Sequence, residues 1–197
     1  MPMAKNTLNV DGLKMDSRFP HEAGHALVAA LTSNDPVRIC DGAHKTDTGH
    51  SANAICTVDF KRGDDETQRD LTLRRIAYHY GGVFGEAYFV CETEHLESCV
   101  LRSCAECLWQ KGDGTEGDAA KVMEIHKENP CLTGDERKAL NSEAWNKAAA
   151  LVKANGSLLQ EIAKRFCADG HLSNEQIRCM IAAEQNRCNQ EVDDPGD

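Results

Sequence analysis

Residues 21–25 read His-Glu-Ala-Gly-His, which places two imidazoles four positions apart with a carboxylate directly after the first. On a helix, residues i and i+4 lie on one face, about one turn apart. Two neutral imidazoles in this arrangement can bind one Zn²⁺, and the glutamate between them can act on a metal-bound water. The alternative interpretation is that the two histidines are unrelated surface residues. Because the spacing brings the two rings together only on a helix, a metal site here requires a helix over the motif.

The flanking residues favour that helix. Asp16 and Ser17 are good N-cap residues, and Pro20 is tolerated in a first turn. The apolar run 25–31 favours a buried helix, and the proline that follows it ends the helix, because the residue before a proline avoids the helical region. We expect a helix over 17–33 whose apolar part holds the two histidines still.

Composition limits the possible partners. The chain has 197 residues and a formal net charge of −10, which fits one domain and argues against nucleic acid or an anionic membrane as a partner. No apolar run approaches the roughly 18 residues needed to cross a bilayer, and the N-terminus has no apolar signal core. We therefore expect a cytoplasmic protein. Without a secretion signal, the ten cysteines favour free thiols or metal ligands over disulfides.

The fold is expected to be mainly α, because aromatic content is low and alanine, leucine and charged residues dominate. Two short β-compatible runs, 37–40 and 54–58, predict a small hairpin or edge sheet after the motif helix. Helical patterns follow to the end of the chain, over 65–90, 118–129, 135–155, 157–169 and from 173 onward. Capping boxes predict two helix starts, one at Ser157 with Gln160 and one at Ser173 with Gln176.

These patterns suggest a single domain over 16–188, with a flexible segment at 1–15 and an acidic tail at 189–197. Residues 91–113 read as a Cys-rich insertion. The paired glycines Gly81-Gly82 lie inside a predicted helix and weaken it, so they imply the close approach of another backbone. We expect that backbone to be the motif helix.

A catalytic zinc usually takes three protein ligands and leaves one position for water. Two carboxylates are candidates for the third ligand. Asp118 begins a predicted helix, where its ordinary role is an N-cap, and Glu86 follows the paired glycines, where its ordinary role is a solvated helix face. Carboxylates are common, so residue type alone does not choose between them.

Four stretches of the chain resemble the FtsH-type peptidase domain, the zinc protease part of membrane AAA proteases. Residues 21–29 (HEAGHALVA) look like its motif helix, and 35–39 look like its Pro-Val step into β structure. Residues 76–86 match its I-A-x-x-x-G-G-x-x-x-E pattern. Residues 112–120 are similar to its T-G-A-x-x-D stretch, which places the third zinc ligand of the family at Asp118. The resemblance covers about residues 18–185 and implies a helical zinc-peptidase domain.

The chain also departs from the family. It has no Gly-rich phosphate loop of the Walker type and no transmembrane segment, so we expect neither the motor nor the membrane anchor in this chain. Residues 91–113 are longer than the usual segment, 42–51 depart from the usual loop, and Gly85 replaces a residue that is commonly alanine. Substrate handling is therefore expected to differ.

The resemblance implies a metalloendopeptidase that hydrolyses peptide bonds through a zinc-activated water. His21 and His25 would be neutral imidazole ligands, Asp118 the third ligand and Glu22 the general base. Glu86 would support the site from outside the ligand set. Flexible or unfolded polypeptides are the expected substrates, and the chain would act alone, as a homo-oligomer or with a separate motor protein.

Two other functions remain open at the level of sequence. One is a catalytically silent adaptor that keeps the peptidase-like fold. The other is a structural zinc domain in which Cys40 or an inserted cysteine closes the site as a fourth ligand. The pair Cys104 and Cys107 has the spacing of half a zinc knuckle, but we expect it to line an apolar helix face with Val100. His44 and His50 are expected to be exposed in a polar loop, and the remaining histidines, His79 among them, have no partner at ligand spacing.

Overall fold

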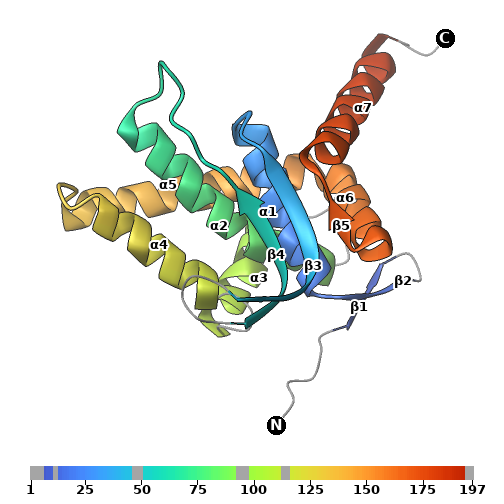
Figure 1. The fold of residues 1–197 in the computed structure, drawn as a ribbon, viewed down its shortest axis with the longest axis horizontal. Helices are drawn as coiled ribbons and strands as arrows, with labels where there is room; N and C mark the ends of the chain where they lie inside the picture. Colours follow the sequence, from blue (N-terminus) through green and yellow to red (C-terminus); the bar gives the residue numbers. More distant parts are fainter. Residues whose placement is uncertain (1–6, 11–12, 46–50, 92–97, 112–115, 194–197) are drawn as a thin grey trace.

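The computed structural model describes residues 7–10, 13–45, 51–91, 98–111 and 116–193. The fold is mainly α, as the composition predicted, with a small antiparallel sheet (Figure 1). The elements in chain order are β1 (Thr7–Val10), β2 (Leu13–Asp16), α1 (Arg18–Thr32), β3 (Val37–Lys45), β4 (Ser51–Val58), α2 (Gln68–Val90), α3 (Ser98–Lys111), α4 (Glu116–Glu128), α5 (Gly134–Ala154), α6 (Gly156–Asp169), β5 (His171–Leu172) and α7 (Asn174–Asp193).

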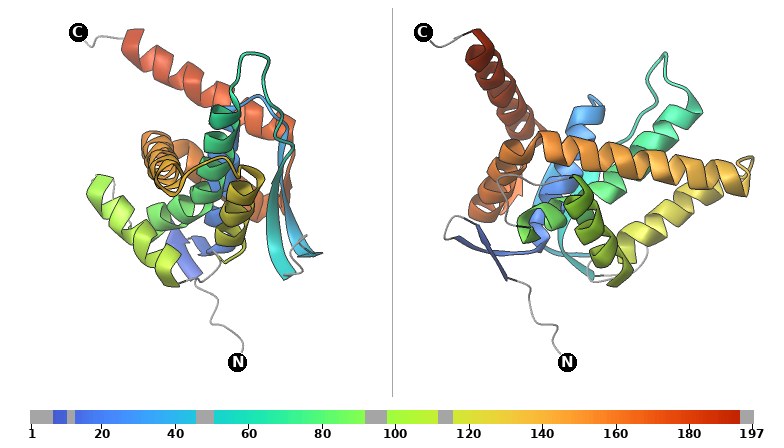
Figure 2. Two further views of the ribbon diagram at one scale, coloured as in Figure 1. Left: turned by 90° about the vertical axis from the view of Figure 1, so that its left-hand side faces the viewer. Right: turned by 180° about the vertical axis from the view of Figure 1, so that it is seen from behind.

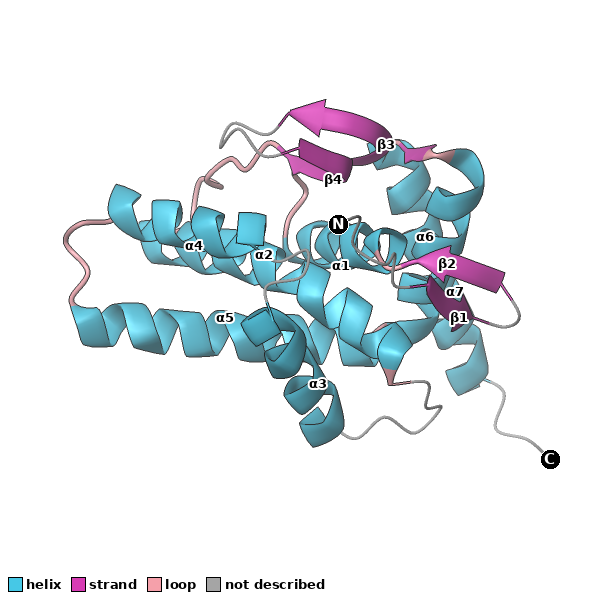
Figure 3. Ribbon diagram, turned by 90° about the horizontal axis from the view of Figure 1, so that it is seen from below, coloured by secondary structure: helices cyan, strands magenta, loops and turns pink. Residues whose placement is uncertain are grey.

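The buried helix α1 lies at the centre of three layers. The sheet formed by β3 and β4 covers one side of α1, while α2 and α4 share its layer and α3 and α5 form the layer beyond (Figures 2 and 3). Eleven residues of α1, from Phe19 to Ala30, are buried. Burial on nearly all sides explains why this helix is apolar through most of its length. It is also why side chains on α1 are held in fixed positions.

The hairpin expected after the motif helix is present. Strands β3 and β4 pair antiparallel, with Val37 opposite Val58 and a register shift between Asp41 and His44. The two-residue strand β5 adds to the other edge of β3, which gives the order β4-β3-β5. The sequence did not indicate β5, because two residues carry too little pattern to be recognised. Strand β4 therefore lies at an edge of this sheet.

The close helix approach expected at the paired glycines occurs between α1 and α2. A Cβ atom on Gly81 would lie 2.6 Å from the carbonyl oxygen of Gly24, and one on Gly85 would lie 2.3 Å from that of Pro20. Real Cβ atoms do not come so near to a backbone oxygen. Glycine at these positions therefore allows the two backbones to touch.

Helix starts were predicted with mixed success. The capping box at Ser173 is confirmed, since the backbone N–H groups of Ser173 and Gln176 each donate to the other residue's side chain. The capping box at Ser157 is wrong. Helix α6 begins at Gly156, after Asn155, so Ser157 already lies inside the helix. Gly156 packs against the Tyr88 hydroxyl, which a Cβ atom would meet at 2.0 Å, so this tight corner between α5 and α6 requires a glycine.

The two chain ends differ from the sequence prediction. Within 1–15, where a flexible segment was expected, β1 and β2 form a hairpin that leads into α1 through the buried Met15. Residues 189–193 continue α7 rather than beginning a tail. Arg178 anchors the earlier part of α7, because its guanidinium donates to the carbonyl oxygens of Ala30 and Ser33 at the end of α1.

Candidate metal centre

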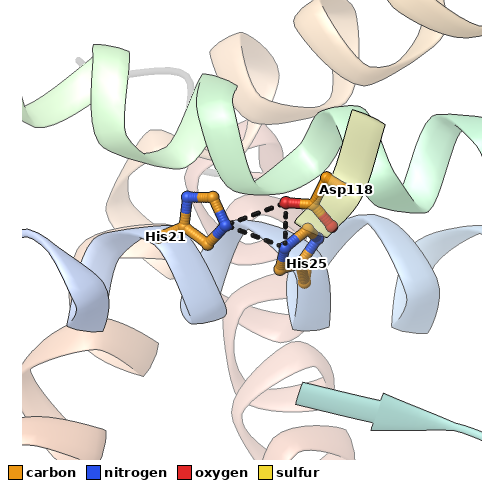
Figure 4. A group of neighbouring side chains, drawn as sticks. All are labelled: His21, His25 and Asp118. Carbon is orange, nitrogen blue, oxygen red and sulfur yellow. Dashed lines mark hydrogen bonds and ion pairs between the residues drawn. The ribbon is translucent and has the colours of Figure 1, made fainter. Parts of the chain in front are cut away.

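Helix α1 presents His21 and His25 one turn apart on the face that meets α2 and α4 (Figure 4). Both residues are buried, with 8% and 4% of their surface exposed. Their Nε2 atoms lie 3.1 Å apart, and the ring centroids are separated by 4.7 Å. Because α1 is packed on nearly all sides, the two imidazoles converge without freedom to turn toward solvent.

Asp118, in the first turn of α4, completes the group. Its Oδ2 atom lies 3.0 Å from His21 Nε2 and 3.2 Å from His25 Nε2. Within the described parts of the chain, His21, His25 and Asp118 form the group that could hold a metal ion. A tetrahedral zinc ion with bonds of about 2.0–2.1 Å keeps its ligand atoms about 3.3 Å apart. The three separations here are close to that value, so the donor atoms fit such an ion in type and in spacing.

Space for an ion is kept by Gly82 of α2. A Cβ atom on Gly82 would lie 2.5 Å from His25 Nε2 and 2.6 Å from His21 Nε2. Any side chain at this position would therefore fill the point on which the imidazoles converge. The second of the paired glycines thus serves the site, while the first serves the contact between the helices.

Hydrogen bonding sets the ring orientation of His25. Its Nδ1 lies 2.7 Å from the carbonyl oxygen of Tyr78. A carbonyl only accepts, so Nδ1 carries the proton and Nε2 of the neutral ring keeps its lone pair for a metal. A backbone carbonyl in this position is a common partner for a metal-ligating histidine.

Glu86 lies on the other side of His21. Its Oε2 atom is 3.5 Å from His21 Nδ1. This distance is short enough for an ion pair but too long for a well-formed hydrogen bond. The Glu86 side chain is buried and contacts the nitrogen that points away from His25. The geometry thus brings Asp118 to the converging Nε2 atoms and places Glu86 on the opposite side of the His21 ring.

His79 of α2 is a site residue that the sequence did not reveal. Its Nδ1 lies 2.8 Å from Oδ1 of Asp118. We expected His79 to have no partner because no second ligand stands near it in sequence. A usable signal was its position relative to Gly82 and Glu86, since the spacing i, i+3, i+7 puts all three on one helix face. That face of α2 is the one turned toward the site.

The titratable groups of the site influence one another strongly. Burial acts to lower the pKa of His21, but the carboxylates of Asp118 and Glu86 outweigh it and hold that pKa well above its usual value. Burial acts to raise the pKa of Asp118, but the charge of His25 and the hydrogen bonds of the three histidines hold it well below its usual value. Burial lowers the pKa of His79. Without a cation, His21 and Asp118 are therefore best described as a buried ion pair.

Glu22 is tied to the edge strand β4. Its Oε2 atom accepts a 2.6 Å hydrogen bond from the backbone N–H of Cys56, and the carbonyl of Cys56 accepts one from the Tyr78 hydroxyl at 2.7 Å. Glu22 is only partly buried, whereas both neighbouring histidines in the motif are buried. Its carboxylate is thus held against β4 rather than free in solvent.

The cysteines do not add to the metal group. None of the described cysteines joins His21, His25 and Asp118 in the group that could hold a metal ion. The prediction that Val100, Cys104 and Cys107 line an apolar face of α3 is wrong by about one position. Val100 and Cys107 are exposed, and Cys104 is partly buried. Leu101 and Ala105 are the buried residues instead. The side chains of His44 and His50 lie outside the described residues.

No protein-family model matches the sequence, and comparison with curated proteins finds no significant match. Among the described helices, none combines the length and the apolar character needed to cross a bilayer. The geometry of the site is therefore the basis for any functional conclusion.

Proposed function

We propose that this protein is a zinc-dependent endopeptidase. The observation that carries the proposal is the convergence of His21 Nε2, His25 Nε2 and Asp118 Oδ2 at 3.0–3.2 Å from one another, beside a fixed glutamate. Nitrogen and oxygen donors of this kind, three in number, are those of a catalytic zinc site that keeps one position open. The resemblance of the motifs to the FtsH-type peptidase domain supports the same assignment.

In the proposed reaction, His21, His25 and Asp118 would hold the metal ion. The ion would supply a Lewis acid that polarises the scissile carbonyl and lowers the pKa of a water molecule to near 7. Glu22 takes the proton of the attacking water and passes it to the leaving amine, a role worth about 10²–10⁴-fold in rate. The hydrogen bond from Cys56 N–H orients the Glu22 carboxylate for this transfer.

The proposed substrates are flexible or unfolded polypeptides. Association with a separate motor protein, or with further copies of the chain, would extend the range of substrates. We place the activity in the cytoplasm, where free thiols such as those of Cys40 and Cys56 would stay reduced.

The decisive experiment combines metal analysis with a cleavage assay. Elemental analysis of the purified protein is expected to give about one zinc per chain, the stoichiometry of a single catalytic site. Casein or a quenched peptide is expected to be cut, with the activity lost on chelation and restored by zinc. Zinc content without any cleavage of either substrate would contradict the proposal.

The alternative is a metal-binding domain without turnover, either an adaptor or a structural unit. One observation favours it: the short hydrogen bond from Cys56 N–H ties Glu22 to β4, so this glutamate also links α1 to the sheet. Against a closed structural site, no described cysteine completes the group as a fourth ligand. The same metal and cleavage measurements separate the two functions.

A further inference from the structure

We propose that His79 is a positioning residue that restricts Asp118 to binding the metal through one oxygen atom. The inference rests on the proposed function, because it concerns how the same metal group would be held. Its consequence is that one coordination position stays open. Neither the motif at 21–25 nor the resemblance assigns a role to His79.

The two oxygen atoms of Asp118 have different partners. Oδ2 faces the converging nitrogens of His21 and His25, at 3.0 and 3.2 Å. Oδ1 faces His79 Nδ1 at 2.8 Å. An ionised carboxylate only accepts hydrogen bonds, so the Nδ1–H of His79 is the donor. One oxygen is thus directed at the metal position and the other is already engaged.

The contact is buried and well constrained. The side chains of Asp118 and His79 are 12% and 15% exposed, so water competes weakly for the hydrogen bond. The His79 ring also packs edge-on against Tyr78, with 4.8 Å between centroids. Because His79 and Gly82 lie one turn apart on α2, the same helix face provides the space for the ion and the donor that orients its carboxylate ligand.

The number of oxygen atoms that bind decides what the site can do. Two imidazole nitrogens and both oxygens of Asp118 would take four positions on the metal, so water could bind only as a fifth ligand. Two nitrogens and one oxygen leave the fourth position open, as a catalytic site requires. The hydrogen bond from His79 to Oδ1 opposes binding of the metal through both oxygens of Asp118. To bind the metal, Oδ1 would have to give up this hydrogen bond at a buried position.

Three variants test the role of His79. His79→Leu removes the donor. His79→Asn keeps an N–H at the position of Nδ1, whereas His79→Asp has the same shape as asparagine without that donor. We expect the leucine and aspartate variants to lose about 10–100-fold in zinc affinity, the usual effect of removing a partner of a ligand. Asparagine is expected to restore the affinity to within a fewfold of the original protein.

The readouts are zinc affinity, measured by competition with a chelator, and visible absorption of the Co²⁺-substituted protein. Cobalt absorption is strong in four-coordinate sites and weak at higher coordination. In the leucine and aspartate variants both oxygens of Asp118 can bind beside water, so these variants should absorb less. The asparagine variant should absorb as the original protein does. His126→Leu is the matched control. It removes a histidine of α4 that contacts Asn141 at 2.8 Å, away from the metal group, and should change neither readout.

Each result decides for or against the inference. Unchanged zinc affinity and an unchanged cobalt spectrum in His79→Leu would overturn it. Should that variant fail to fold, equal behaviour of the asparagine and aspartate variants would overturn it instead. Neither readout requires peptide cleavage, so a protein that binds zinc but cuts nothing would refute the proposed function alone. A protein that binds neither metal would refute both.

Discussion

Gly24 of α1 and Gly81 of α2 lie so close together that a Cβ atom on Gly24 would be 2.1 Å from the carbonyl oxygen of Gly81. This contact sets the distance between the helix that carries both histidines and the helix that carries Gly82, His79 and Glu86. The backbones, rather than side chains, define the interface at this point. The shape of the metal site therefore depends on two residues that donate nothing to it.

Gly24→Ala is expected to destabilise the protein by about 1–3 kcal/mol, the usual cost of overpacking, because the added methyl group meets backbone atoms that cannot move aside. Denaturant unfolding monitored by circular dichroism measures the change. The control is Gly134→Ala, where a Cβ atom has no neighbour within 4 Å. That substitution should change the free energy of unfolding by less than about 0.5 kcal/mol. Equal effects of the two would contradict the helix contact.

Gly82→Ala is expected to reduce zinc binding. Its Cβ atom would lie 2.5 Å from His25 Nε2 and 2.6 Å from His21 Nε2, so the methyl group and the ion compete for the same space. Chelator competition measures the affinity. Gly63→Ala, whose Cβ atom would meet only the Glu66 side chain at 3.6 Å, is the control and should bind zinc normally. Normal binding by Gly82→Ala would show that the ion does not sit between these nitrogens.

Glu22→Gln is expected to keep zinc and lose about 10²–10⁴-fold in the rate of peptide cleavage, because the amide cannot accept the proton of water. The substitution preserves shape and an oxygen that can accept from Cys56 N–H. Metal analysis and a quenched-peptide assay give the two measurements. His25→Ala is the contrasting variant, and we expect it to lose the metal itself. Full activity of Glu22→Gln would remove this residue from the mechanism.

Zinc affinity is expected to fall as pH falls. Zinc binds the neutral imidazole, and the raised pKa of His21 means that this ring holds a proton up to a pH above its usual titration range. Below the raised pKa, binding must displace that proton, so affinity should drop by about tenfold per pH unit. Chelator competition between about pH 6 and 8 tests this, around the ordinary pKa of histidine. A constant affinity over that interval would contradict the ion pair between His21 and Asp118.

Arg74→Met is expected to cost about 1–3 kcal/mol in unfolding free energy, because it leaves two partly buried carboxylates without their hydrogen-bond donor. The Arg74 guanidinium is 6% exposed and donates to both oxygens of Glu66 at 2.8 Å, as well as to Asp35. Thermal and denaturant unfolding measure the loss. Arg69→Met, which removes an exposed ion pair with Glu143, is the control and should leave stability nearly unchanged. Similar losses in both variants would contradict the prediction.

Local patterns predicted most of the secondary structure. The spacing of apolar residues placed α1 and α2, and alternation of β-compatible residues placed the pairing parts of β3 and β4. The errors arose where packing overrides local preference. Helix α6 already begins at Gly156, which packs against the Tyr88 hydroxyl, and α3 buries Leu101 rather than Val100 because of the face that it turns to its neighbours.

The sequence by itself determined that His21 and His25 share one face of a buried helix, because their spacing matches the helical repeat. It also offered Asp118 and Glu86 as carboxylates without a geometric reason to prefer either. Only the tertiary structure decided that Oδ2 of Asp118 meets both Nε2 atoms, and that His79 engages the other oxygen. These residues lie far apart along the chain, and only the packing of α1, α2 and α4 fixes the distances between their atoms.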